Sequence, residues 1–233
     1  LLLDGSYFWN APLLQKMPYD PVADFSPVCL TNIAPSILVV HPSVPVKSVK
    51  ELIALAKARP GDLNFGAGPA GGGPHLAAEA FKSMAGINIV YVRYKGAGPA
   101  LNALLSGEVQ LMVFTPVSVM PFLKSGKLKG LAVASAQPSA LFPGMPTVGT
   151  SGLPGYESAT LTGVFVPAKT PAAIVTRLNQ EIVRVLNRPD VKEKFLNTAT
   201  EVVASSPDEF AAYVKSVVTR VGKLIKDANI KAE

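Results

Sequence analysis

The sequence predicts an α/β protein, and three observations lead to this fold class. Apolar runs typical of strands alternate with amphipathic stretches typical of helices between about residues 37 and 134. The 21 prolines and 19 glycines fall mostly between these segments, where they would end one element and begin the next. Hydrophobic residues make up 48% of the 233 residues and charged residues 16%, which excludes a disordered chain. Such alternation favours a parallel sheet with helices between its strands.

The elements of the central segment follow from their boundary residues. A β-branched strand at 37–41 ends before Pro42. The next helix begins at a capping box, Ser48 to Glu51, and stops at Pro60 and Gly61. A short strand at 63–65 leads into a glycine-rich loop, and Pro74 suits the first turn of the helix that follows. The remaining predicted elements are strands at 87–92, 109–114 and 130–134 and short helices at 99–105 and 117–124.

The pattern of alternating strands and helices ends after Ser135. Prolines and glycines predict a long irregular connection to about residue 155, then a strand at 161–166, helices at 171–186 and 189–197, and a capped last helix from Ser206. We therefore expect one lobe at 43–134 and a second lobe assembled from 1–42 and 135–233, with a ligand cleft between them. The chain begins inside a strand-like run, Leu1-Leu2-Leu3, without methionine or a recognisable signal peptide, so we expect residues 1–233 to lack the N-terminal portion of that lobe.

The glycine-rich loop is the strongest functional feature. Five glycines at positions 66, 68, 71, 72 and 73 follow a strand and open onto a helix. A helix start carries unpaired N–H groups and a partial positive charge, so this arrangement predicts an anion site. The same residues match the dinucleotide pattern G-x-G-x-x-G, and Arg93 stands near the place where that pattern has its acidic ribose ligand. An NADP-linked oxidoreductase that uses this loop stays open as an alternative.

Other classes of function find less support in the residues. The net charge of +6 is scattered and does not form the basic stripe of a nucleic-acid-binding protein. Cys29 is the only cysteine and lies in an apolar run, and two distant histidines predict no metal site. No apolar run reaches 18 residues, so we expect no membrane-embedded segment. Tyr91 and Lys95 match a reductase spacing, which needs a helix; on a predicted strand they are ~13 Å apart.

No catalytic set is recognisable. A nucleophile elbow and a clustered pair of carboxylates are both missing from the sequence, and His75 has no evident nucleophile to activate. We therefore expect a protein that binds without catalysing a reaction and that needs no cofactor.

A family resemblance extends over the whole chain. Residues 16–28 match the pattern K-x-P-Y-D-P-x-x-D-F-x-P-V, and further segments at residues 92–96, 152–157 and 226–231 agree in order. The chain resembles the substrate-binding proteins of tripartite tricarboxylate transporters, the Bug-type receptors. The resemblance implies a two-lobe architecture of the periplasmic-binding-protein type (type II). It also implies a periplasmic receptor that captures a small carboxylate (a di- or tricarboxylate, an aromatic acid or an acidic amino acid) and passes it to the transporter's membrane components.

The resemblance also implies where a ligand is held. One family loop corresponds to residues 66–75, and the turn at 94–96 and the strand end at 115 line the same cleft. The ligand-binding residues that it implies are Gly66, Ala67, Gly68, Gly72, Gly73, His75, Tyr94, Lys95, Thr115 and, from the first lobe, Ser6.

Three departures from the family pattern bear on recognition. Ala67, Gly72 and Gly73 replace hydroxyl residues, and the family's common Asp is missing at Thr115, which disfavours amino-acid ligands. The family's first ligand loop would precede Leu1. The effector-sensing part of a transcription regulator shares the two-lobe architecture and remains a further alternative.

Overall fold

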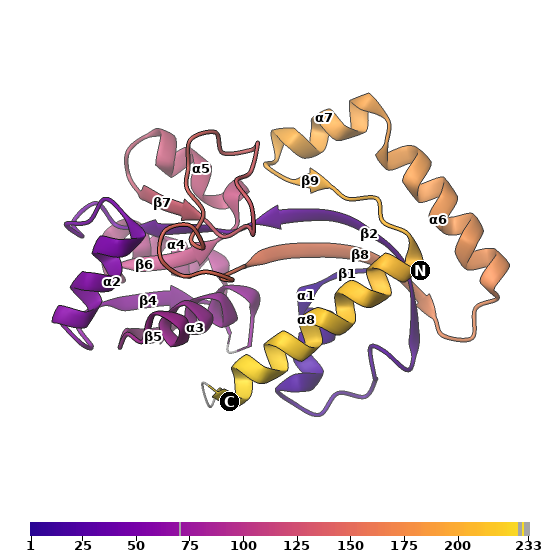
Figure 1. The fold of residues 1–233 in the computed structure, drawn as a ribbon, viewed down its shortest axis with the longest axis horizontal. Coiled ribbons are helices and arrows are strands. Elements are labelled where there is room, and N and C mark those ends of the chain that lie inside the picture. The colour runs from indigo at the N-terminus through magenta and orange to yellow at the C-terminus, as the bar shows by residue number, and fades with distance from the viewer. Residues whose placement is uncertain (70, 228–229, 231–233) are drawn as a thin grey trace. The chain divides into compact units, whose positions relative to one another are not determined.

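The computed structural model describes residues 1–69, 71–227 and 230, without the side chains of Asp4, Ser6 and Tyr7. The chain forms two compact units. Figure 1 colours the chain by residue number. Unit 1 consists of Leu1–Ala34 together with the segment from Thr160 onward, and unit 2 consists of Pro35–Ala159. The chain therefore passes between the units twice.

Unit 2 is built on a five-stranded sheet of order β5-β4-β6-β3-β7. Its strands are β3 (Ile37–Val40), β4 (Asn64–Ala67), β5 (Val90–Arg93), β6 (Leu111–Phe114) and β7 (Lys129–Val133). Strand β4 pairs in parallel with both β5 and β6, as predicted, but β3 runs antiparallel to β6 and β7. The prediction of a fully parallel sheet is therefore wrong at β3, and the reason is topological. Residues 41–63 leave β3 and return to the same edge of the sheet, so their helix makes no crossover.

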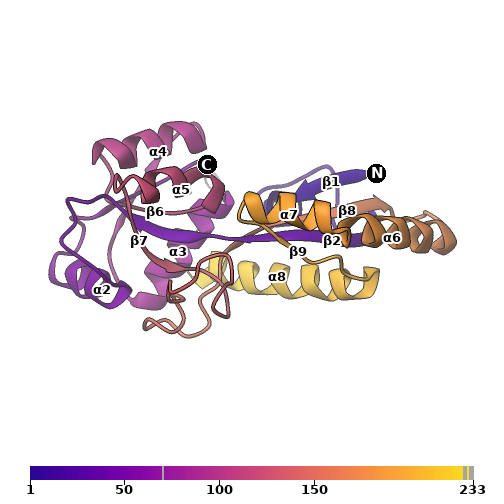
Figure 2. The same cartoon turned by 90° about the horizontal axis from the view of Figure 1, so that it is seen from above.

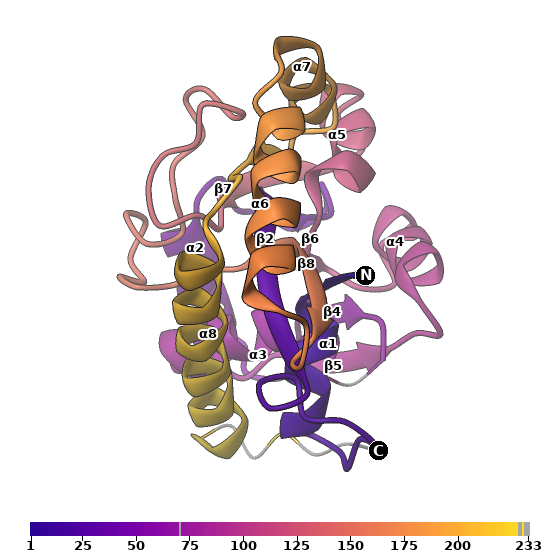
Figure 3. The same cartoon turned by 90° about the vertical axis from the view of Figure 1, so that its right-hand side faces the viewer.

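Four helices cover this sheet on both faces. They are α2 (Val49–Ala58), α3 (Gly73–Ala85), α4 (Ala97–Ser106) and α5 (Pro116–Lys124). Helices α2 and α3 lie on one face, and α4 and α5 lie on the other (Figures 2 and 3). The predicted cap of α2 is confirmed, since the Glu51 N–H donates to Ser48 Oγ at 3.2 Å. The Glu51 carboxylate accepts instead from the Lys47 N–H at 2.7 Å, one residue before the expected donor.

The boundaries of unit 2 differ from the predicted lobe at 43–134. Strand β3 lies inside the sheet with all four residues buried, so it belongs to this core. The irregular segment after β7 also packs here, because Thr147 bridges to Val133 and the Tyr156 hydroxyl donates to the Ala77 carbonyl at 2.9 Å. Tyr156 is fully buried against Phe81. Proline and glycine content shows that a segment is irregular but not which sheet it covers.

Unit 1 holds the second sheet, of order β1-β8-β2-β9. Its elements are β1 (Leu2–Gly5), α1 (Ser6–Asn10), the 3₁₀ turn η1 (Ala11–Leu13), β2 (Phe25–Pro35), β8 (Ala159–Pro167), α6 (Ala172–Leu186), α7 (Pro189–Asn197), β9 (Glu201–Val202) and α8 (Pro207–Asp227). Helices α6 and α8 contact each other, as Figure 3 shows. The capping box of α8 is confirmed, with the Ser206 N–H donating to the Glu209 carboxylate at 2.8 Å. Cys29 is buried as predicted, and this burial raises the pKa of its thiol to about 11.

Aromatic packing organises the core of unit 1. Trp9 on α1, Phe165 on β8 and Phe210 on α8 are buried and contact one another, with ring centroids 4.8–6.1 Å apart. Gly163 lies under this cluster, where an added Cβ would stand 2.1 Å from Phe210 Cζ. The strand therefore needs a residue without a side chain at this position.

We expect Gly163→Ala to destabilise the protein by about 1–3 kcal/mol, because the buried ring has to move to admit the methyl group. Gly222→Ala on α8 is the matched control. Its added Cβ meets only Leu13 Cδ2 at 3.9 Å, so the higher helix propensity of alanine should be neutral or stabilising by up to about 1 kcal/mol. Urea unfolding of both variants beside the unaltered protein measures the difference. Equal midpoints for the two variants would contradict the packing argument.

Candidate functional site

Three helices begin at one edge of the unit 2 sheet. Strands β4, β5 and β6 are parallel, so their carboxyl ends meet at the same edge, with β4 in the middle. Each strand leads directly into a helix: β4 through the glycine loop into α3, β5 through Tyr94–Gly96 into α4, and β6 through Thr115 into α5. Helix N-termini carry partial positive charge and unpaired N–H groups. We call this arrangement the carboxyl edge; it is a candidate site for an anion.

The glycine loop and the turn after β5 are in contact. The Tyr94 N–H donates to the Ala67 carbonyl at 2.9 Å. A Cβ on Gly68 would lie 3.8 Å from Gly96 Cα, so the two backbones pass close together. Two adjacent connections and the element ends that flank them thus contain five of the predicted residues, Ala67, Gly68, Gly72, Gly73 and Lys95. Thr115 reaches the same edge through the neighbouring strand, and its hydroxyl pairs with that of Ser118 at 3.1 Å.

Backbone donors come from the helix starts more than from the loop. The Gly71 N–H donates to His75 Nδ1 at 3.0 Å, and the Gly72 N–H donates to the Pro69 carbonyl at 3.1 Å. The first turn of α3 offers at most two backbone donors, Gly73 and His75, because Pro74 has no N–H. A ligand at this edge would therefore meet first-turn N–H groups, and the loop would supply shape.

The structural reason for a glycine differs between positions of the loop. Gly71 has φ +77°, the left-handed region that favours glycine, whereas Gly72 has φ −66°. A Cβ on Gly73 would meet nothing within 4 Å. A Cβ on Gly66 would stand 3.0 Å from Val109 Cγ2, so Gly66 makes room for packing and is not placed to approach a ligand.

Tyr94 and Lys95 differ in their surroundings. The Tyr94 hydroxyl donates to Glu108 Oε1 at 2.7 Å, near the amino end of β6 and away from the carboxyl edge. Burial and this hydrogen bond raise the pKa of the Tyr94 hydroxyl to about 12, so it stays protonated at neutral pH. Lys95 is exposed. Ser6 is the first residue of α1 in unit 1, and its side chain lies outside the described residues.

The structure places two residues at the glycine loop for which the sequence analysis predicted no role there. Tyr91 lies on β5, which confirms the predicted strand, and its hydroxyl donates to the Gly68 carbonyl. Glu79 lies one helical turn beyond His75 and is 7% exposed, with its Oε1 atom 4.0 Å from His75 Nε2. The spacing of His75 and Glu79 was the available signal, since residues four apart share one face of a helix.

The described residues show two further features of the chain as a whole. None of their helices is long and apolar enough to cross a bilayer. Their His, Cys, Asp and Glu side chains form no group of three or more suited to a metal ion.

Comparison with known proteins identifies close structural relatives. A family model described as "Tripartite tricarboxylate transporter family receptor" matches residues 2–230. A solved R. palustris protein with adipate is 34% identical, with a TM-score of 0.87 over 98% of this chain and 77% of that chain. Similar values hold for the periplasmic binding protein BugD (29%, TM-score 0.84, 99% and 78%). MatC from Rhodopseudomonas palustris with bound malate is 27% identical (TM-score 0.81, 96% and 78%).

These likenesses confirm the predicted fold class, an α/β protein of the periplasmic-binding-protein type. The chain spans about two thirds of the length of the curated relatives that it matches, 65% and 67% for the first two.

Two substitutions in the glycine loop distinguish the backbone shape of the loop from the access that it gives a ligand. Gly73→Val should leave stability within about 0.5 kcal/mol, because its Cβ enters open space, and should still weaken anion binding by occupying the approach to α3. Gly71→Ala should cost about 1–2 kcal/mol of stability through its left-handed backbone. Thermal unfolding and calorimetric titration with adipate measure the two effects. Unchanged affinity in Gly73→Val would place the ligand elsewhere.

Proposed function

The chain belongs to the tripartite tricarboxylate transporter receptor family, and we propose that it captures a small carboxylate as the solute-binding receptor of such a transporter. The observation that carries this function is the meeting of three helix N-termini at the carboxyl edge, around a loop of glycines. Each helix start favours negative charge, and small residues let a ligand come close to the backbone. A carboxylate satisfies both features, since it presents two acceptor oxygens in a small volume.

The proposed ligand class is the small carboxylates, among which a dicarboxylate of short to medium length is favoured. Two similar proteins were solved with adipate and with malate, both dicarboxylates. The carboxyl edge here has Thr115, an uncharged residue, where a carboxylate would be needed to balance the ammonium group of an amino acid. Lys95 is exposed in the turn after β5, and we propose that its ammonium group meets a carboxylate of the ligand. Tricarboxylates and aromatic acids share this chemistry and remain within the proposed class.

Partners and location follow from the same proposal. A receptor of this family would act in the periplasm and hand its ligand to the membrane components of the transporter. Its chemistry is binding alone, without catalysis, cofactor or metal. Glycine and proline residues dominate the carboxyl edge, and backbone groups of this kind bind anions but transfer no protons.

Neither alternative from the sequence gains support. The family match and the similar structures point to binding proteins rather than to an oxidoreductase or a regulator. The glycine that opens the dinucleotide pattern, Gly66, serves packing against Val109, and the Gly71 and Gly72 N–H groups are already used inside the loop. In a dinucleotide site the pyrophosphate lies at the helix N-terminus, close to the backbone of the glycine loop.

Binding to a carboxylate panel tests the proposed function. Adipate, malate and citrate should raise the melting temperature in a concentration-dependent way, because a ligand that binds only the native state stabilises it. Glutamate should do so less, since Thr115 offers its ammonium group no charge partner. Glucose and NADPH are the controls. Stabilisation by either control, with none by the acids, would overturn the receptor function.

The contribution of Lys95 can be measured beside a matched lysine. Lys95→Ala should weaken adipate binding by about 1 kcal/mol or less, because an exposed ammonium group loses much of its attraction to solvent screening. Lys57→Ala, an exposed position in the last turn of α2, should leave the affinity unchanged. In titrations at low and at high salt, the loss of adipate affinity in Lys95→Ala should be smaller at high salt, because salt screens the charge. An equal loss in both variants would mean that net charge alone matters.

A further inference from the structure

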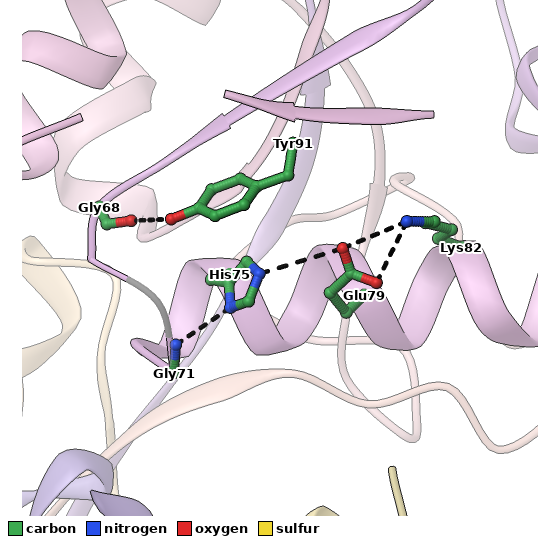
Figure 4. A network of polar contacts seen from close by, with 6 residues as sticks. All are labelled: Gly68, Gly71, His75, Glu79, Lys82 and Tyr91. Carbon is green, nitrogen blue, oxygen red and sulfur yellow. Dashed lines mark hydrogen bonds and ion pairs between the residues drawn. The ribbon is translucent and has the colours of Figure 1, made fainter. Parts of the chain in front are cut away.

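Two aromatic side chains hold the two sides of the glycine loop. The Tyr91 hydroxyl, from β5, donates to the Gly68 carbonyl. His75 Nδ1, from the first turn of α3, accepts the Gly71 N–H at 3.0 Å. The two rings pack on each other, with centroids 4.2 Å apart and planes inclined by 36°. Figure 4 shows both hydrogen bonds reaching the loop from a single ring pair.

The hydrogen bond from Gly71 fixes the tautomer of His75. A ring nitrogen that accepts a hydrogen bond carries no proton, so the proton of the neutral imidazole lies on Nε2. That nitrogen faces Glu79 Oε1 at 4.0 Å, and Glu79 in turn pairs with Lys82 at 3.4 Å. His75 and Glu79 are 5% and 7% exposed. The acceptor of the imidazole therefore faces the loop, and Glu79 and Lys82 follow along α3 on the side of Nε2 (Figure 4).

The hydrogen bonds act where the loop has least intrinsic stiffness. Gly68 and Gly71 carry no side chain that packing could hold, and glycine loses more backbone freedom on ordering than any other residue. A loop that is ordered before binding leaves less entropy to be lost when the ligand arrives. Phe65 on β4 supports the ring pair, with its centroid 5.1 Å from that of Tyr91. The loop is therefore held by the packed core of unit 2.

We propose that Tyr91, His75 and Glu79 are positioning residues that set the shape of the glycine loop for carboxylate binding. This inference rests on the proposed function of the carboxyl edge. The Tyr91 hydroxyl and the Nδ1 atom of His75 form hydrogen bonds with the loop backbone, so they act on the ligand through Gly68 and Gly71. Glu79 acts one step further back, by orienting the imidazole.

Three variants separate positioning from simple packing. His75→Asn keeps an acceptor near the position of Nδ1, because the side-chain oxygen of asparagine lies at the same distance along the chain. His75→Leu has a similar volume but no acceptor, and leaves the Gly71 N–H without its partner. Tyr91→Phe keeps the ring and removes only the hydroxyl that reaches Gly68. We expect adipate affinity to fall about fivefold in His75→Leu and in Tyr91→Phe, the loss of about one net hydrogen bond, and to be largely retained in His75→Asn.

Two readouts in the ligand-free protein test the geometry without relying on affinity. The ¹⁵N spectrum of His75 should show the tautomer protonated on Nε2, and hydrogen exchange of the Gly71 amide should quicken in His75→Leu but not in His75→Asn. The opposite tautomer, or equal exchange in both variants, would overturn the proposal. A drop in melting temperature that is the same for His75→Asn and His75→Leu, with equal loss of affinity, would show a packing role only and also overturn it.

The outcome also separates this inference from the proposed function. If the unaltered protein binds no carboxylate, the proposed function fails, and the role in carboxylate binding fails with it. If the unaltered protein binds adipate and His75→Leu and Tyr91→Phe bind it equally well, only the positioning role is overturned.

Discussion

The parallel pairing of β4 with both β5 and β6 is the constraint on which the candidate site depends. Parallel strands end at the same edge of a sheet, and each of these strands is followed by a helix within a few residues. The start of each helix is then fixed at that edge by the hydrogen bonds of the sheet. Three partial positive charges lie at this edge, and the described residues there include no buried lysine or arginine. Such a site avoids the desolvation penalty of a buried lysine or arginine while still favouring an anion.

The parallel strands alone would leave the connection between β4 and α3 flexible, since this connection consists largely of glycines. The left-handed backbone at Gly71 and the hydrogen bonds from Tyr91 and to His75 resolve this conflict. Small residues give access to the backbone, and side chains from outside the loop provide the order that the loop cannot supply itself. The two demands, access and rigidity, are thus met by different parts of unit 2.

The sequence predicted most elements because their boundaries are local. Serine caps, prolines and glycines act within a few residues, so the strand and helix that flank the glycine loop could be placed from the printed residues alone. The direction of β3 and the packing of Tyr156 on α3 could not be predicted, because both depend on partners far along the chain. The role of Tyr91 was missed for the same reason, because its partner Gly68 lies 23 residues away in the sequence. Glu79 is four residues from His75, so its role did have a local signal. Family resemblance located the loop, whereas the contacts of each residue within it required the structure.

The glycine pattern itself shows why a motif needs its contacts. Gly66 leaves space for Val109 and Tyr94, Gly71 adopts a left-handed backbone, and Gly73 opens the start of α3. These are three separate physical reasons for one residue type, and only the last concerns a ligand. A dinucleotide site requires that the same glycines serve the turn, the phosphate approach and the helix–strand contact in a set order. Here the first glycine is used for side-chain packing, and the N–H of the third, Gly71, is bound by His75. The chain therefore has the spacing G-x-G-x-x-G, but its glycines do not have the roles that they have in a dinucleotide site.

The anion site that remains is formed by the helix starts, and it matches a small carboxylate better than a nucleotide.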